Sequence, residues 1–158
     1  NKAVADELLA VHQYMYFHFR CDDMGYDLLS GLFKRTAIQE MMHVEQLSER
    51  ILFLKGEVEM KTSGDVQKIH EPKEMLELAT AMEEGSVNDY NAWAQECAAN
   101  ADAVSKLFET LVAEEKFTKI SMKQNWTTWR NSEPITWPCN LLNAVKAWPW
   151  EPLPQENK

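Results

Sequence analysis

The chain has few of the residues that interrupt helices. Its 158 residues include only 5 glycines and 6 prolines, and five of those prolines lie beyond residue 133. No apolar run approaches the roughly 18 residues that cross a bilayer, and no signal-peptide pattern is visible. These absences predict a mostly helical, soluble and cytoplasmic protein.

Positive charge is scarce as well. The chain has 16 Lys and Arg against 25 Asp and Glu, a formal net charge of −9. Phosphate backbones and anionic membranes require basic surfaces, so neither nucleic acid nor a membrane is expected as a partner. An acidic balance suits a protein that handles cations. The three cysteines, Cys21, Cys97 and Cys139, show no Cys-x-x-Cys spacing and are expected to be reduced thiols.

Apolar residues recur in steps of three and four along the first 130 residues. They predict helices over about 1–24, Tyr26–Lys55, Pro72–Ala99 and Asp102–Trp129. The first two are expected to end at Gly25 and Gly56. The expected core-facing residues are Val4, Leu8, Val11, Met15 and Phe19 in the first helix, Leu28, Leu32, Ile38, Met42, Leu47, Ile51 and Leu54 in the second, and Val104, Leu107, Phe108, Leu111 and Ile120 in the fourth.

Loop lengths indicate the topology. The breaks at Gly25 and Asn100 are so short that each joins two antiparallel neighbours, whereas residues 57–70 can travel the length of the molecule. The chain is therefore predicted to be all-α, a four-helix bundle with one long crossover between helices 2 and 3. An up-down bundle with a loose middle loop is the alternative.

Five polar residues interrupt the apolar stripes: Glu7, Glu40, His43, Glu83 and Glu114. Glu40 and His43 stand at i and i+3, on one helix face. In an antiparallel hairpin, residues equidistant from the turn lie level. Glu7 and His43 are equidistant from Gly25, and Glu83 and position 117 are equidistant from Asn100. Both hairpins thus place a Glu on each helix near a common height.

Four carboxylates at one level of a bundle core cannot all stay ionised without a partner, because burial and mutual repulsion both oppose the charge. A bound cation relieves both effects. Oxygen ligands with one imidazole suit iron, manganese or zinc. The competing interpretation, four unrelated surface glutamates, leaves the matching heights unexplained.

Three stretches carry a family resemblance: Asp6-Glu-Leu-Leu-Ala-Val-His-Gln-Tyr14, Gln39-Glu-Met-Met-His-Val44 and Glu49-Arg-Ile-Leu-Phe-Leu-Lys-Gly56. Over residues 1–130 the chain resembles bacterioferritin and the smaller bacterioferritin-like members of the Dps group. The resemblance implies a ferritin-like domain that binds iron and oxidises Fe(II) for storage or detoxification, within a homo-oligomeric shell of 12 or 24 subunits or one mixed with a second subunit type.

The resemblance also implies roles for residues. Glu7, Glu40, His43, Glu83 and Glu114 would ligate two iron ions, with Glu40 and Glu114 bridging. Tyr14 would hydrogen-bond the site or donate an electron, unless it is a plain core tyrosine. Met41 would ligate haem at a subunit interface, unless it is adaptable packing.

One residue departs from the family pattern. Where a second His is expected, the sequence has Phe117, and a phenyl ring cannot ligate a metal. This leaves three outcomes: two unequal metals, one metal, or a non-catalytic or haem-binding subunit with a degraded site. A third class, a di-iron enzyme of the rubrerythrin type, would need rubredoxin-like cysteine pairs that the sequence lacks.

The last segment, 131–158, differs in composition. Tryptophan and proline dominate it together with the end of the fourth helix: Trp126, Trp129, Trp137, Trp148 and Trp150, and Pro134, Pro138, Pro149, Pro152 and Pro154. It is predicted to be an irregular tail whose aromatic rings pack on the bundle or on a neighbouring subunit, with cofactor stacking as the alternative.

Overall fold

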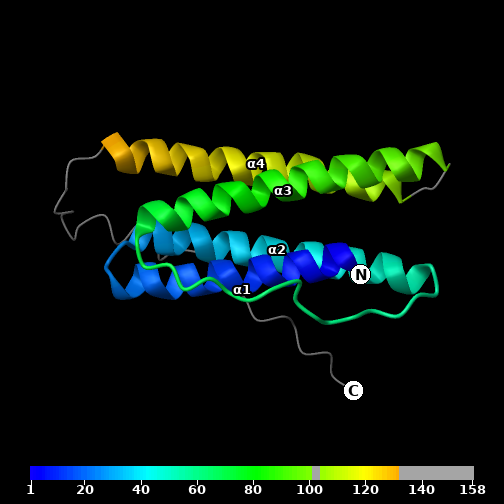
Figure 1. The fold of residues 1–158 in the computed structure, drawn as a ribbon, viewed down its shortest axis with the longest axis horizontal. Coiled ribbons are helices and arrows are strands. Elements are labelled where there is room, and N and C mark those ends of the chain that lie inside the picture. Colours follow the sequence, from blue (N-terminus) through cyan, green and yellow to red (C-terminus); the bar gives the residue numbers. More distant parts are fainter. Residues whose placement is uncertain (101–103, 132–158) are drawn as a thin grey trace, which may run out of the picture.

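Four long α-helices make up the part of the chain that the structure, a computed structural model, describes: residues 1–100 and 104–131. They are α1 (Lys2–Asp23), α2 (Asp27–Phe53), α3 (Pro72–Ala99) and α4 (Ser105–Asn131). Figure 1 shows an elongated bundle with α1 and α2 in one layer and α3 and α4 in the other. The predicted all-α bundle with one long crossover is confirmed. From residue 132 on, the predicted tail lies outside the described residues.

In residues 1–100 and 104–131, no helix is both long enough and apolar enough to cross a bilayer.

Two glycines shape the ends of the first hairpin's helices. Gly25 has a φ of 77° and donates its backbone N–H to the Asp22 carbonyl. A side chain in this left-handed conformation costs roughly 1–2 kcal/mol. After α2, the left-handed residue is Lys55, with a φ of 64°, rather than Gly56. At Gly56 a Cβ would lie 3.0 Å from Ile51 Cγ2, so a side chain there would require Ile51 to move by a few tenths of an ångström.

The crossover between α2 and α3 is fixed to α1 by hydrogen bonds. Ser63 donates its backbone N–H to the Ala5 carbonyl at 3.0 Å. The Gln13 side chain donates to the Gln67 carbonyl at 2.9 Å and accepts from the Gln67 N–H at 2.7 Å. Figure 1 shows this segment running along the outside of α1. The alternative of a loose middle loop is therefore wrong.

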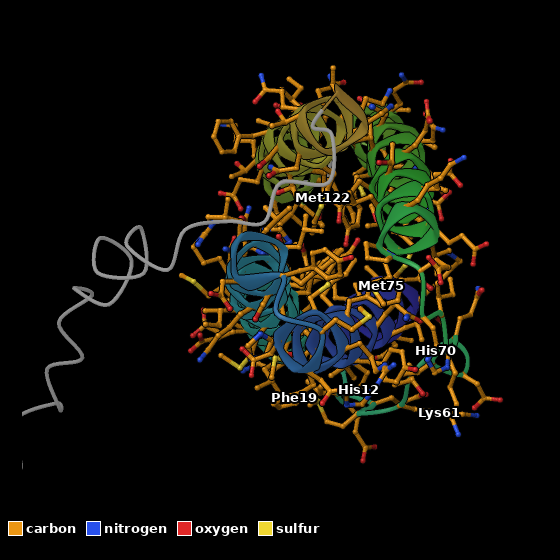
Figure 2. All side chains as sticks on the ribbon, turned by 90° about the vertical axis from the view of Figure 1, so that its left-hand side faces the viewer. His12, Phe19, Lys61, His70, Met75 and Met122 are labelled. Carbon is orange, nitrogen blue, oxygen red and sulfur yellow. The ribbon has the colours of Figure 1, made fainter. Side chains whose placement is uncertain are left out.

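Two apolar clusters fill the interior and leave a polar layer between them. One contains Ala10, Tyr14, Phe17, Cys21, Leu29, Leu32, Phe33, Ala37, Met75, Leu76, Ala79 and Met122. The other contains Ala3, Val4, Val44, Leu47, Tyr90, Leu111 and Val112. Figure 2 shows Met75 and Met122 inside the bundle and Phe19 and His12 at its outside. Buried acidic residues lie between the clusters, so apolar packing on both sides holds them away from water.

Part of the predicted core stripe is wrong. Phe19 is 61% exposed, whereas Phe17 is fully buried. Other predicted core residues that are exposed are Leu28, Ile38, Met42, Leu54 and Ile120. The buried face of α1 includes small and polar residues such as Ala10, Gln13 and Cys21. A prediction based on large apolar residues leaves these residues out, and it therefore assigns a neighbouring face of α1 to the core.

Candidate metal centre

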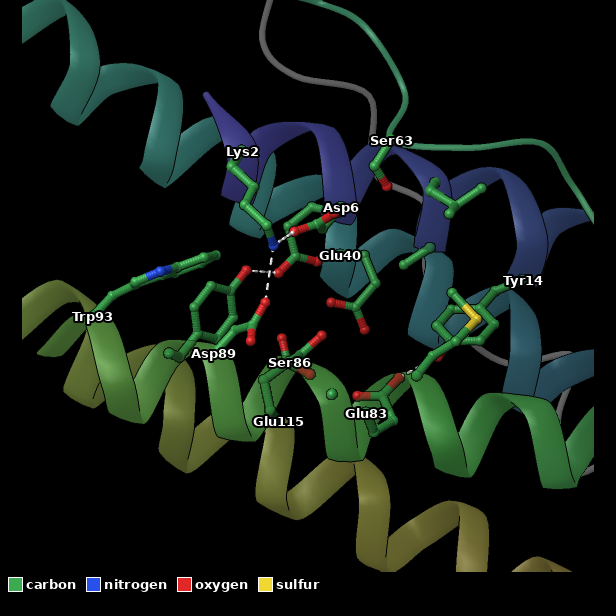
Figure 3. Close-up of a pocket in the computed structure, with 16 residues that line it drawn as sticks. Lys2, Asp6, Tyr14, Glu40, Ser63, Glu83, Ser86, Asp89, Trp93 and Glu115 are labelled. Atoms are coloured by element: carbon green, nitrogen blue, oxygen red, sulfur yellow. Dashed lines mark hydrogen bonds and ion pairs between the residues drawn. The ribbon is translucent and has the colours of Figure 1, made fainter.

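Side chains from three helices meet in the polar layer. Glu7 of α1, Glu40 and His43 of α2 and Glu115 of α4 each bring a ligand atom to within 4.8 Å of the others. None of the four residues is more than 3% exposed. Figure 3 shows Glu40 and Glu115 pointing toward each other across the cavity. Glu7, Glu40 and His43 thus lie together, as the sequence predicted.

Glu83 of α3 completes the acidic layer. It is 2% exposed and lines the same cavity as Glu7, Glu40 and Glu115. Burial raises the pKa of Glu83 well above its usual range, and the nearby Glu115 raises it further. All four helices therefore contribute a carboxyl group.

The two nitrogens of His43 have different surroundings. Nδ1 lies 2.8 Å from Glu40 Oε2 and 3.1 Å from Glu115 Oε1. Nε2 lies 2.7 Å from Glu114 Oε2. In the neutral ring, a proton on Nε2 donates to Glu114, and this leaves the Nδ1 lone pair directed at the acidic cluster. A carboxylate behind an imidazole in this way is the usual support for a metal-binding histidine.

The structure places Glu115, and not Glu114, in the buried cluster. Glu115 is 1% exposed, whereas the side chain of Glu114 is 39% exposed and reaches only the outer nitrogen of His43. The predicted position is off by one residue because α4 begins at Ser105 rather than near Asp102. The centre of the second hairpin lies beyond Asn100, so the residues of α4 that are level with Glu83 have later numbers.

The same shift removes Phe117 from the expected histidine position. Phe117 is 73% exposed and points away from the interior. Three residues after Glu115 stands Thr118, which is 4% exposed and donates its hydroxyl to the Glu114 carbonyl at 3.3 Å. Within the described part of the chain, His43 supplies the one imidazole of this cluster. The departure from the family pattern therefore persists, with Thr118 as the residue involved.

Five buried polar atoms of the cluster have no partner in hydrogen-bond geometry, although Nδ1 of His43 lies at ion-pair distance from two of the others. They are both carboxylate oxygens of Glu40, Nδ1 of His43, Oε2 of Glu83 and Oε1 of Glu115. Burial raises the pKa of Glu40 and of Glu115, in each case against the opposing effect of His43. Burial alone would lower the pKa of His43, but Glu115, Glu40 and Glu7 together raise it far above its usual range.

A metal ion fits these unsatisfied atoms. Buried polar atoms without partners are rare in folded proteins, and converging carboxylates with an imidazole are a donor set for iron, manganese or zinc. Ligands about 2.0–2.2 Å from one ion lie at most about 4.4 Å apart. The 4.8 Å spread of this cluster needs only small side-chain movements to reach that geometry.

Two tyrosines support the layer in a crossed arrangement. Tyr14 of α1 donates its hydroxyl to Glu83 of α3, and Tyr90 of α3 donates its hydroxyl to Glu7 of α1. Burial raises the pKa of both phenols well above the usual value, so both stay protonated and act as donors. Tyr90 was not predicted as a site residue. The signal was available, because Glu83 and Tyr90 repeat the spacing of Glu7 and Tyr14.

Met41 and the cysteines lie outside this cluster. Met41, next to Glu40 in sequence, is 56% exposed on the outer side of α2. Cys21 is a buried free thiol, and Cys97 is half-buried. Burial raises the pKa of Cys21 to about 11, so this thiol is protonated at neutral pH.

The sequence matches a known family over most of its length. Residues 1–123 match the ferritin-like domain family. A four-helix bundle with a carboxylate and histidine layer in its core is the architecture of that class.

Similarity to individual proteins identifies the family more narrowly. The bacterioferritin of Rhodobacter capsulatus is 33% identical over 118 residues, which cover 73% of each chain. That of Desulfovibrio desulfuricans is 37% identical over 117 residues, covering 73% of this chain and 65% of that protein. The chain therefore belongs to the bacterioferritin family. It spans just under two thirds of the Desulfovibrio protein.

Solved structures agree with this assignment. A structure of the Desulfovibrio bacterioferritin, with its diiron site in different catalytic states, gives a TM-score of 0.80 at 33% identity and covers 83% of this chain and 77% of that one. The Rhodobacter structure, which holds haem iron and a metal-free dinuclear site, gives a TM-score of 0.77 at 24% identity and covers 86% of this chain and 92% of that one. The latter match supports the fold.

Proposed function

We propose that this chain binds Fe(II) as a substrate in the acidic layer and oxidises it with dioxygen or peroxide. The convergence of unsatisfied carboxylate oxygens with His43 Nδ1, in an otherwise apolar core, carries the proposal. Carboxylates favour Fe(III) over Fe(II), so a site built from them promotes loss of an electron. The relatives' diiron chemistry is consistent with it.

The five buried groups divide into two unequal metal positions. Glu7 and His43 would hold one ion and Glu83 the other, with Glu40 and Glu115 between them. Only the first position has a nitrogen donor, because Thr118 stands where the second imidazole would be. Glu114 would orient His43, and the crossed tyrosines would orient Glu7 and Glu83. Tyr14 is also the proposed electron donor close to the second position.

Fe(II) oxidation tests the function directly. Purified protein mixed aerobically with Fe(II) is expected to develop ferric absorbance at least tenfold faster than Glu40→Ala or His43→Ala variants, because each variant loses a ligand of the buried layer. Metal analysis of the same preparations should find bound iron or zinc in the wild type. Equal rates in the three proteins would remove the enzymatic function, and a wild type without bound metal would favour a non-catalytic subunit.

We further propose that Met41 ligates haem between two subunits, as the thioether of an exposed methionine can. The related Rhodobacter protein contains haem iron. Protein reconstituted with haem is expected to show a shifted Soret band that is lost in Met41→Leu, while Met42→Leu, an equally exposed neighbour, retains it. Identical spectra in both variants would show that Met41 is only a packing residue.

The proposed setting is a cytoplasmic shell of 12 or 24 copies, either of this chain alone or mixed with a second subunit type. The described surface supports assembly, because large apolar side chains lie exposed on α1 and α2: Phe19, Leu28, Ile38, Met41, Met42, Leu52 and Phe53. Exposed apolar residues at this density on neighbouring helices are typical of protein contacts.

A further inference from the structure

A half-open cavity connects the acidic layer with the surface between α1 and α3. It measures about 210 Å³, and its inner wall includes Glu40, Glu83 and Glu115. Its outer rim includes Lys2, Asp6 and Asp89, which are 34–65% exposed in their side chains. Figure 3 shows the two groups in one view, with the rim residues beside Trp93 and the buried glutamates further along the cavity.

One cation already occupies the rim. The Lys2 ammonium lies 2.8 Å from Asp6 Oδ2 and 2.9 Å from Asp89 Oδ2, so two carboxylates from different helices converge on one point. It also lies 4.8 Å from the centroid of the Trp93 ring. The paired aspartates raise the pKa of Lys2 and keep it charged.

We propose that Asp6 and Asp89 form an outer binding site for divalent cations, which Lys2 holds closed as an exchangeable competitor, and that cations pass from this site to the buried glutamates. The inference rests on the proposed function, because it concerns how metal reaches the same inner layer. It adds a site that precedes that layer.

The buried end of the cavity supports a cation path independently of the rim. Glu40 is 1% exposed and its Oε1 has no hydrogen-bond partner, and Glu83 is 2% exposed with Oε2 likewise without one. Both line the cavity that the rim opens into. The inner end of the cavity therefore offers carboxyl oxygens as ligands to a cation that enters from the rim.

Lys2 is suited to exchange. Exposed ion pairs contribute little to stability, so an arriving divalent cation has only a weak contact to displace. Oxygen ligands bind such a cation more closely than an ammonium, at about 2.0–2.6 Å. When Lys2 swings out, the flexible side chain remains anchored to α1, ready to return after the cation moves inward.

Rates of Co(II) uptake by metal-free protein test the passage. The inner site is followed by its Co(II) absorbance after rapid mixing. Lys2→Gln is expected to accelerate uptake about fivefold, because one unit charge a few ångströms away changes the local cation concentration by about that factor. Asp6→Asn with Asp89→Asn removes two charges and is expected to slow uptake by more than that factor. Added salt should reduce both effects. The final absorbance should be unchanged, since none of these residues belongs to the inner layer.

Lys73→Gln and Glu77→Gln are matched controls. Lys73→Gln makes the same charge change as Lys2→Gln, and Glu77→Gln removes one of the two charges that the aspartate pair loses, at an exposed ion pair of α3 that does not line the cavity. Uptake rates that are equal in all variants, or that follow net charge in the controls as well, would overturn the outer site. Absence of the Co(II) spectrum in every protein would instead contradict the proposed function.

Terbium luminescence at equilibrium tests separately whether the outer site binds cations. In Lys2→Gln, a terbium ion between Asp6 and Asp89 would lie near Trp93 and emit when the indole is excited. Emission is expected to fall severalfold when Trp93→Phe is added, and also when both aspartates are replaced by asparagine. Emission that persists in either combination would show that terbium binds elsewhere and would overturn the site.

Discussion

Replacing Glu115 by glutamine is expected to weaken Co(II) binding by metal-free protein a hundredfold or more. The amide keeps the size of the side chain but removes the negative charge beside Glu40 and His43, where Glu115 Oε1 lies 3.1 Å from His43 Nδ1. A loss of a hundredfold corresponds to about 2.7 kcal/mol, a reasonable contribution for a charged ligand in a buried site. Titration of the Co(II) absorbance measures it.

Glu114→Gln is the matched control, one residue earlier on the same helix. Because Glu114 contacts only His43 Nε2, its loss should disturb the orientation of the ring and weaken binding about tenfold, the lower part of the range for such supporting residues. Binding that depends more on Glu114 than on Glu115 would reverse the assignment and make Glu114 the ligand.

The sequence predicted the residues of the buried cluster correctly in the first hairpin but not in the second. The spacing of Glu7, Glu40 and His43 about Gly25 was sufficient, because the first hairpin turn contains few residues and fixes the heights of both helices. The second turn is longer than the break at Asn100 suggests. An error of one residue rotates a helical position by about 100°, which exchanges Glu114 for Glu115.

The face that a helix buries was harder to predict than its ends. The bounds of α3, Pro72–Ala99, were predicted to the residue, since Pro72 and Asn100 are strong end signals. The buried face of α1 was assigned from its large apolar residues, and Phe19 proved exposed. In this bundle the charged and polar residues of the acidic layer occupy part of the buried face of each helix. The exposed faces of α1 and α2 also bear large apolar residues, so hydrophobicity alone does not distinguish the core from the surface.

The acidic layer should also make the metal-free protein less stable as pH rises. Burial raises the pKa values of Glu40, Glu83 and Glu115 above the value of 4.5 expected when the chain is unfolded. The folded state therefore retains protons that the unfolded state releases above about pH 4.5. The pKa of His43 is also raised, which gives the same sign above its unfolded value of 6.5. Stability is present at low pH and falls through neutrality.

The expected change in unfolding free energy is a sizeable fraction of the stability of a typical domain. One carboxyl that stays protonated in the fold lowers the unfolding free energy by about 1.4 kcal/mol for each pH unit over which it keeps its proton. Urea denaturation of metal-free protein across the neutral range measures the slope. A stability that rises from pH 5 to pH 8 would show that these carboxyl groups are solvated rather than buried.

Substitutions at two adjacent residues distinguish the effect of the buried carboxyl groups on the pH dependence from that of surface charge. Glu83→Gln removes one buried carboxyl and should flatten the slope, whereas Glu84→Gln should leave it intact, because Glu84 is exposed and its pKa is lowered by Lys119. Saturating Zn(II) should reverse the slope, since the metal binds ionised ligands and releases their protons. The same unpaired carboxylates that weaken the empty bundle at neutral pH would then stabilise the loaded one, so the proposed function and the pH dependence have one cause.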